Sequence, residues 1–320
     1  MAEVYCLYCL KNFPSADSRH GCAFNHSWPG YVAVKDLEAH EKAIEGHALY
    51  KVQNFNPSCR KVAFDVTVDA SDLEILVIVR CKVEYSRGQD QPNWNSDKKK
   101  EFLKALQHVP GLWDGHHKLV HTNGNQSVTY TPVFFIDTAA TDQTKQYTLN
   151  AVTAPEPVIL PSGQVTVQCN AFVPLGSGYA QNATPGAGTR HQLAMGVSQT
   201  APRLFPENTN QQNGPVMNAM AHEYAHMIGI PDEYIELKGS WNECGDDKDK
   251  AAYLWSVALQ NENIPVPQNT GPNNPDLNVM NLNLESRPAG FKKRHYVTVL
   301  EAARQASAAH QDLGGTWTLA

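Results

Sequence analysis

The chain has 320 residues, of which 42% are hydrophobic, so it is long and apolar enough to bury one or two cores. Its 26 basic and 32 acidic residues give a formal net charge of −6, and without a long basic block this balance argues against a nucleic-acid partner. No apolar run reaches the roughly 18 residues of a transmembrane helix, so we expect no membrane span.

Residues 1–60 are rich in cysteine, histidine and aromatic residues, and we expect them to form an N-terminal segment of their own. Several residues of metal-binding type cluster near its start: Cys6, Cys9, His20, Cys22 and His26. The first two have the spacing with which small zinc sites begin, but the rest of the pattern is irregular. Three alternatives therefore stay open, namely a second metal, a disulfide within the segment, and free thiols.

Residues 61–229 follow the order strand, helix, strands and a second helix, which is typical of an α+β fold. Alternating or β-branched apolar residues predict strands at 62–68, 73–85, 128–137, 148–152 and 164–169. Ser96 is placed to cap a helix from Asp97 to about Val109. Residues 190–198 are either an edge strand that pairs with an extended substrate or a simple connection to the second helix.

The second helix is predicted by residues 216–228, which contain no Gly or Pro. Pro215 suits the first helical position, because its missing N–H has no partner there in any case. Gly229 suits the residue after the helix, because it adopts positive φ without strain. Apolar residues recur at helical spacing, as expected for a buried face: Met217, Met220, Tyr224 and Met227.

This helix carries the pattern that bears most directly on function. His222 and His226 are four residues apart, so both imidazoles lie on one helix face and can bind one metal ion. Glu223 then lies beside the metal, where it can take a proton from a bound water. Asp232 follows the turn at Gly229 and is the expected third ligand, which leaves one zinc position open for water.

The stretch resembles the extended zinc-binding consensus of the metzincin metallopeptidases, His-Glu-x-x-His-x-x-Gly-x-x-His/Asp. Five residues match it position by position: His222, Glu223, His226, Gly229 and Asp232. The aspartate followed by x-Tyr is similar to the snapalysin-type enzymes. The resemblance implies a Zn²⁺ cofactor and a zincin-like α+β fold, with a twisted mixed sheet, an active-site helix and a C-terminal helical subdomain. It also implies that Tyr234 hydrogen-bonds the oxyanion of the transition state, with a packing role for Tyr234 as the alternative.

Residues 230–320 are expected to form this C-terminal subdomain. Metzincins carry a methionine turn beneath the zinc, and residues 278–281 supply Met280 for it. The long gap before Met280 implies an insertion at residues 239–276, with a short helix at 251–260. The spacing of apolar residues predicts a last helix over residues 291–309.

Two points about the site stay open from the residues alone. Glu233 or Glu236 can replace Asp232 as third ligand, because any carboxylate gives a similar metal distance. His295, on the last predicted helix, is a further candidate to reach the site.

These features predict a zinc-dependent endopeptidase that acts on a protein or peptide substrate, with Glu223 as general base. The alternatives are a zinc amidase acting on cell-wall or other non-peptide amides, and a catalytically inactive zincin that binds a partner protein. Residues 1–10 lack the basic and apolar regions of a secretory signal peptide. We therefore expect a protein that is cytoplasmic in its producer. It would be held by a cognate inhibitor or immunity protein and exported as an effector or toxin by a signal-less route such as a contractile injection system.

Overall fold

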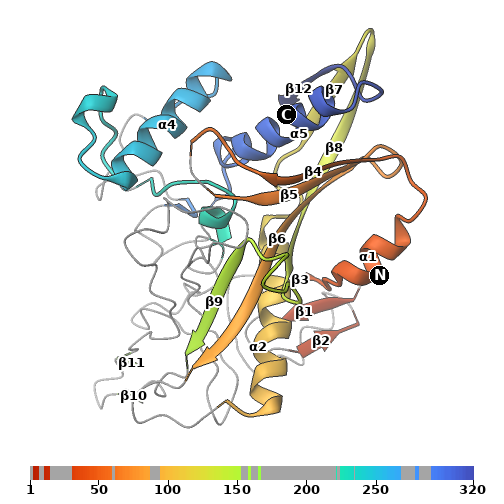
Figure 1. Cartoon of the computed structure of the whole chain (residues 1–320), viewed down its shortest axis with the longest axis vertical. Helices are drawn as coiled ribbons and strands as arrows, with labels where there is room; N and C mark the ends of the chain where they lie inside the picture. The colour runs from red at the N-terminus through yellow and green to blue at the C-terminus, as the bar shows by residue number, and fades with distance from the viewer. Residues whose placement is uncertain are drawn as a thin grey trace.

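Strand β6 (Glu74–Ser86) runs through the middle of the structure and is built from the apolar, β-branched run EILVIVRCKVEYS (Figure 1). The computed structural model describes the following residues: 3–6, 11–14, 31–59, 62–86, 94–152, 158–159, 165–166, 221, 224–233, 235–267, 278–280 and 290–320. All structural statements below concern these residues.

The main sheet has the strand order β12-β7-β8-β6-β5-β4, and β9 also pairs with β6. The strands around β6 are β4 (Leu49–Phe55), β5 (Phe64–Asp69), β7 (Leu119–Asn123), β8 (Gln126–Asp137), β9 (Tyr147–Val152) and β12 (Thr316–Leu319). Strand β6 pairs in parallel with β8 and β9, and the other pairs of this sheet are antiparallel. The fold is therefore α+β with a curved mixed sheet.

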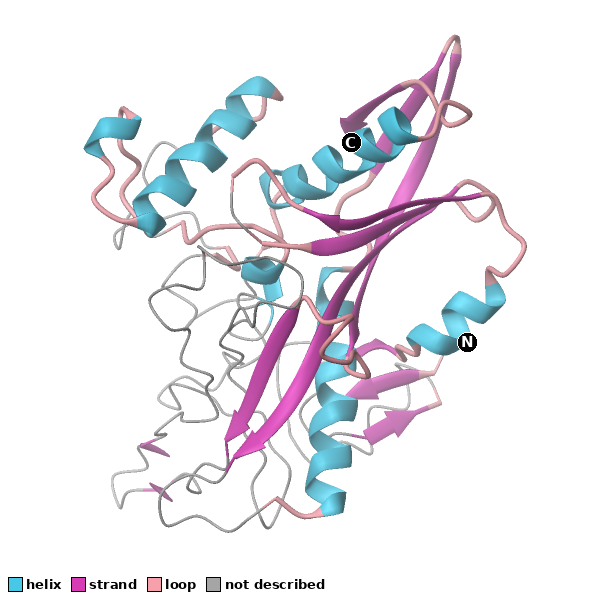
Figure 2. Cartoon of the chain, in the orientation of Figure 1, coloured by secondary structure: helices cyan, strands magenta, loops and turns pink. Residues whose placement is uncertain are grey.

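Helices lie on and beside this sheet (Figure 2). The α-helices are α1 (Leu37–Ala43), α2 (Ser96–His108), α4 (Asp247–Asn261) and α5 (Val297–Ala309), and the 3-10 helices are η2 (Val109–Trp113), η3 (Trp241–Glu243) and η4 (Lys293–Tyr296). Two small sheets complete the described part, one of β1 (Val4–Cys6), β2 (Lys11–Phe13) and β3 (Tyr31–Ala33), the other of β10 (Val158–Ile159) and β11 (Val165–Thr166). No helix among the described residues has the length and apolarity to cross a membrane.

The two faces of β6 belong to different parts of the core, because successive side chains of a strand point to opposite sides. Ile75, Val77 and Val79 belong to the main core, whereas Leu76 and Ile78 join a small cluster on the other face. Helix α5 packs on β4, β5 and β12. Its buried apolar residues and those of the short helical stretch at 224–227 all lie in the main core. The main core thus holds the last part of the predicted metal-binding helix.

Most predicted elements are found within a few residues of their expected limits. These are β5, β6, β8, β9 and helices α2, α4 and α5. The last helix was predicted from residue 291, but its first turn is the 3-10 helix η4 and the α-helix begins at Val297. Of the strand expected at 164–169, residues 165–166 are described and form β11. The region expected at 190–198 lies outside the described residues.

Several elements were not predicted. Strand β4 lies inside the expected N-terminal segment, yet it pairs with β5 in the main sheet. The short strand β7 has the polar sequence LVHTN, and its outer partner β12 comes from the end of the chain. The sequence pattern around β7 and β12 gives little signal because each strand is only four or five residues long.

Candidate metal centre

The predicted metal-binding helix ends where the sequence indicated. Gly229 has a φ of +96°, and its N–H donates to the carbonyl of His226 at 3.1 Å. The N–H of Ile230 donates to the carbonyl of Ala225 at 2.9 Å. These two bonds form a Schellman motif, with glycine at the position that needs a left-handed backbone. The motif turns the chain back along the helix end.

Gly229 is also required by close packing. A Cβ atom placed there would lie 2.6 Å from Cγ of Pro57 and 3.3 Å from side-chain atoms of Thr298 and Val62. The thiol of Cys59 donates to the Gly229 carbonyl at 3.3 Å. The turn is therefore held against both the chain before β5 and helix α5, and a larger residue has no room.

The turn brings His226 and Asp232 together. Nε2 of His226 lies 3.1 Å from Oδ1 of Asp232, and the two side chains are only 5% and 4% exposed. Nδ1 of His226 lies 2.7 Å from the carbonyl oxygen of Ile230. A carbonyl only accepts, so Nδ1 carries a hydrogen, and in a neutral ring Nε2 would then be an acceptor that faces the carboxylate.

Two acceptor atoms at this distance need a proton or a cation between them. Ligating histidines typically donate their second nitrogen to a carbonyl or carboxylate, as His226 does to Ile230. Two tetrahedral zinc ligands lie about 3.4 Å apart, given zinc–ligand distances near 2.1 Å. The separation of 3.1 Å between His226 and Asp232 is close to that value. The described part of the site therefore fits a metal ion of this kind.

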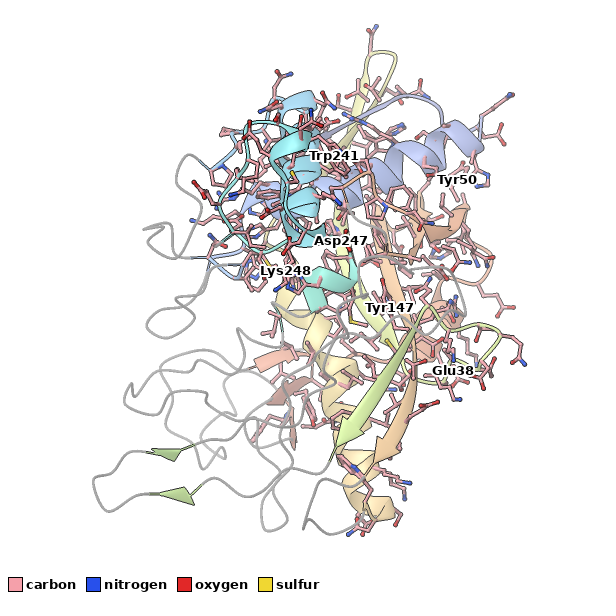
Figure 3. All side chains as sticks on the ribbon, turned by 60° about the vertical axis from the view of Figure 1, so that its left-hand side comes forward. Glu38, Tyr50, Tyr147, Trp241, Asp247 and Lys248 are labelled. Atoms are coloured by element: carbon pink, nitrogen blue, oxygen red, sulfur yellow. The ribbon has the colours of Figure 1, made fainter. Side chains whose placement is uncertain are left out.

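Aromatic side chains fix the helix that carries the site. The indole of Trp113 donates to the carbonyl of Ala221, the residue before His222, at 3.0 Å. Tyr147 lies on β9 (Figure 3), and its phenol donates to the carbonyl of Met227 at 2.7 Å. Tyr296, at the start of α5, donates to the carbonyl of Trp113 at 2.6 Å. The helix is thus bonded to the sheet and, through Trp113, to the C-terminal helix.

Glu233, the residue after Asp232, is fully buried and bound by four hydrogen bonds. Arg294 donates to both carboxylate oxygens, from Nε at 2.6 Å and from Nη2 at 2.7 Å. His295 Nε2 lies 2.9 Å from Oε1, and Asn278 donates to Oε2 at 2.7 Å. Burial raises the pKa of Glu233, but the bonds from Arg294 and the contact with His295 outweigh it and bring the pKa down to about 2.

The segment 278–280, which was expected to form a methionine turn, lies against Glu233. The N–H of Glu233 donates to the carbonyl of Met280 at 2.9 Å. The N–H of Met280 donates to the side chain of Asn278 at 2.8 Å, and the Met280 side chain is fully buried. The segment that the resemblance assigned to a methionine turn therefore contacts the loop that carries Asp232.

The two alternative third ligands lie in different settings. Both oxygens of Glu233 are occupied by Arg294, His295 and Asn278, so they have no capacity left for a metal. The side chain of Glu236 is 80% exposed and pairs with Lys238 at 3.2 Å. Among these three acids, Asp232 is the one whose carboxylate faces His226.

Three of the five predicted site residues, His222, Glu223 and Tyr234, lie outside the described residues. So do four of the five residues of the N-terminal Cys and His cluster, Cys9, His20, Cys22 and His26. The structure thus brings together His226 and Asp232, and it adds Glu233, Arg294 and Asn278 as their supports. Glu233 and His295 were expected in other roles, and no sequence pattern marks Arg294 or the side chain of Asn278 as part of the site.

A second group of metal-binding type lies at the turn between β5 and β6. Nδ1 of His47 lies 2.8 Å from Oδ2 of Asp69 and 3.9 Å from Oδ2 of Asp72. Asp69 is fully buried, and its other oxygen accepts the N–H groups of Ser71 and Asp72. The hydrogen bond to Asp69 raises the pKa of His47; burial raises the pKa of Asp69, but its bonds lower it overall. No local pattern in the sequence predicts this group, because His47 and Asp69 are 22 residues apart and meet only when β4 pairs with β5.

A cavity of about 620 Å³ lies between α1, α2 and the end of β8. Lysine and acidic side chains both line it, and none of the predicted site residues does. One of its lysines, Lys35, is already paired with Asp114 and lies 4.5 Å from the centre of the Phe135 ring. The cavity is therefore separate from the candidate metal centre.

Comparison of the chain with protein-family models, with curated proteins and with solved structures found no match.

Proposed function

We propose that the protein is a zinc-dependent endopeptidase with a metzincin-like arrangement of its site. The observation that carries the proposal is the buried pair of His226 and Asp232, with Nε2 and Oδ1 3.1 Å apart and Nδ1 engaged by the Ile230 carbonyl. This is the geometry of a histidine prepared to bind a metal through Nε2.

The ligand set favours zinc over the hard cations. His222, His226 and Asp232 would supply two imidazole nitrogens and one carboxylate oxygen. Imidazole suits zinc and other transition metals, whereas calcium and magnesium prefer oxygen ligands throughout. When bound, zinc would lower the pKa of a water molecule and polarise the substrate carbonyl.

Glu223 and Tyr234 supply the remaining chemistry in this proposal. Glu223 takes a proton from the attacking water and later gives it to the leaving amine. Tyr234 donates a hydrogen bond to the oxyanion that forms in the transition state. His226 is kept in the required tautomer by Ile230 throughout.

The fold supports the proposal in a general way. A curved mixed sheet carries the helix on its main core face, and helix α5 follows the turn at Met280. The buried contact between Glu233 and Met280 joins the loop after the helix to this turn. Such an order of parts suits a metzincin-like peptidase.

The decisive experiment compares the full chain with Glu223→Ala. We expect both proteins to bind one zinc ion per chain, measured by elemental analysis, and we expect casein cleavage only by the wild type. Glu236→Ala is the matched control, because Glu236 is exposed and pairs with Lys238, and it should retain activity.

Other results would contradict the proposal. Full casein cleavage by Glu223→Ala would show that Glu223 is not the general base. Zinc binding without casein cleavage, but with release of amines from peptidoglycan fragments, would replace the peptidase with an amidase. Zinc binding without turnover of either substrate would favour an inactive zincin that binds a partner protein.

A further inference from the structure

The segment that carries Asp232 is fixed at both of its ends. At one end, Ile230 donates its N–H to Ala225 at 2.9 Å and accepts from Nδ1 of His226 at 2.7 Å. At the other end, Glu233 is bound through both its backbone and its side chain. Pro231 fixes one further backbone angle between them. Asp232 therefore has little freedom to move away from His226.

Most of the fixation at the second end comes from four residues, Glu233, Asn278, Arg294 and His295, which we term the Glu233 clamp. Its donors come from the methionine turn and from η4. His295 is itself oriented, because its Nδ1 accepts the N–H of Lys292 at 3.1 Å, which leaves the hydrogen on Nε2 for Glu233. Arg294, His295 and Asn278 thus all donate to one carboxylate.

The clamp distinguishes two adjacent acids. A carboxylate has about four acceptor sites, and the clamp uses four hydrogen bonds to fill those of Glu233. Arg294 also balances the buried negative charge with a bidentate ion pair. Glu233 is thereby withheld from the site, and Asp232 is the acid presented to His226.

We infer that the Glu233 clamp positions Asp232 for metal binding, so that Glu233 is a positioning residue of the metal centre. This inference rests on the proposed function only in taking His226 and Asp232 as metal ligands. Loss of a group that orients a metal ligand typically weakens metal affinity by about 10- to 100-fold. A purely structural Glu233 would instead change the stability of the fold and leave the affinity of the folded protein unchanged.

The test compares Glu233→Gln with a matched variant, Asp65→Asn. Asp65 is also a buried carboxylate, which accepts from Arg80 Nε at 2.6 Å, from Gln146 at 2.6 Å and from the Asn54 N–H at 2.8 Å. It belongs to β5, and these three hydrogen-bond partners lie outside the clamp. The zinc dissociation constant is measured on the full chain by competition with a chromophoric chelator, and the unfolding temperature is measured in EDTA.

We expect both variants to unfold at lower temperature than the wild type. We expect Glu233→Gln to bind zinc about 10- to 100-fold more weakly, and Asp65→Asn to bind it within about threefold of the wild type. Equal zinc affinity for wild type and Glu233→Gln would overturn the inference, and so would an equal loss in both variants.

Arg294→Lys is the second test variant, to be used if Glu233→Gln does not fold. It keeps the charge and loses the bidentate fork, so zinc affinity should fall while the chain stays folded. Unchanged affinity in this variant would overturn the inference. If the wild type binds zinc but does not cleave casein, the proposed peptidase function is refuted. The positioning role of the Glu233 clamp would still be supported by weaker zinc binding in the clamp variants. A wild type that binds no zinc would refute both.

Discussion

Two histidine–aspartate pairs in the described part of the chain look alike in composition and differ in construction. His226 lies 3.1 Å from Asp232, and His47 lies 2.8 Å from Asp69. His47 points Nδ1 at its carboxylate, so that pair is complete as a hydrogen-bonded ion pair. His226 gives Nδ1 to a carbonyl and turns Nε2 to Asp232. A bridging proton or cation would satisfy both atoms of this second pair, and metal-ligating histidines typically have the same kind of carbonyl partner.

Burial and support separate the two pairs further. The His47 side chain is 27% exposed, and its second carboxylate, Asp72, is 57% exposed. The side chains of His226 and Asp232 are buried, and the next residue, Glu233, is bound by the other residues of the clamp. A histidine next to an aspartate is therefore a weak sign of a metal site by itself. The hydrogen-bond partner of the other ring nitrogen is the stronger sign.

The largest expected effect comes from removing each histidine in turn. His226→Ala should weaken zinc binding by more than about 100-fold, because loss of a ligand exceeds the effect of a lost supporting contact. His47→Ala should leave zinc affinity unchanged. Chelator competition on the two full-length variants measures both values. A loss of zinc in His47→Ala, with retention in His226→Ala, would reverse the assignment of the two pairs.

The glycines beside the pairs give the next effect. Gly46 and Gly229 both have positive φ, at +90° and +96°. A Cβ on Gly46 meets no atom within 4 Å, whereas one on Gly229 would lie 2.6 Å from Pro57. Gly46→Ala should therefore cost only the left-handed backbone strain, about 1 to 2 kcal/mol. Gly229→Ala should cost a further 1 to 3 kcal/mol or so, as overpacking does.

Urea unfolding in EDTA measures both glycine variants without any contribution from bound metal. Equal losses of stability in the two variants would show that the contact between Gly229 and Pro57 has no effect on the folded state.

The smallest expected effect is the pH dependence of the His47 pair. The folded-state pKa of His47 is raised, so its contribution to stability is fully present below the unfolded pKa, near 6.5, and is lost as pH rises through the folded value. The pKa of Asp69 is lowered, so its contribution is present above about pH 3.8 and is lost as pH falls further. The pair therefore stabilises the fold most between roughly pH 4 and pH 6.5.

Unfolding temperatures measured between roughly pH 5 and pH 8 in EDTA test this dependence. The wild type should lose a small increment of stability across that range, and His47→Gln should lose less, because glutamine does not titrate. An identical pH profile in the two proteins would mean that another group is responsible.

The sequence predicted the local features of the site better than its long-range ones. Gly229 at the helix end followed from backbone chemistry alone, and the structure confirms its positive φ. The contact of His226 with Asp232 also follows from local geometry, since six residues and one tight turn separate them. Asp232 was the expected third ligand, and Glu233 and Glu236 stayed open as alternatives, because each supplies a carboxylate just past the same turn.

The choice among these acids depends on contacts that no local pattern encodes. Arg294 lies 61 residues after Glu233 in the chain, and its surroundings read as an ordinary helix start. The same limit applies to β4 and β12, whose partners are known only once the sheet is formed. Local sequence therefore predicted helix ends and turns, but it did not predict ion pairs between residues that are far apart in the chain.

The order of the clamp residues along the chain has a consequence for synthesis. A ribosome makes Asp232 and Glu233 before it makes the arginine that pairs with Glu233, which comes 61 residues later. A buried carboxylate without a counter-charge is costly, so we expect Glu233 to enter the interior only after η4 has been made. The hydrogen bonds that fix the segment carrying Asp232 would therefore form only after η4 has been translated.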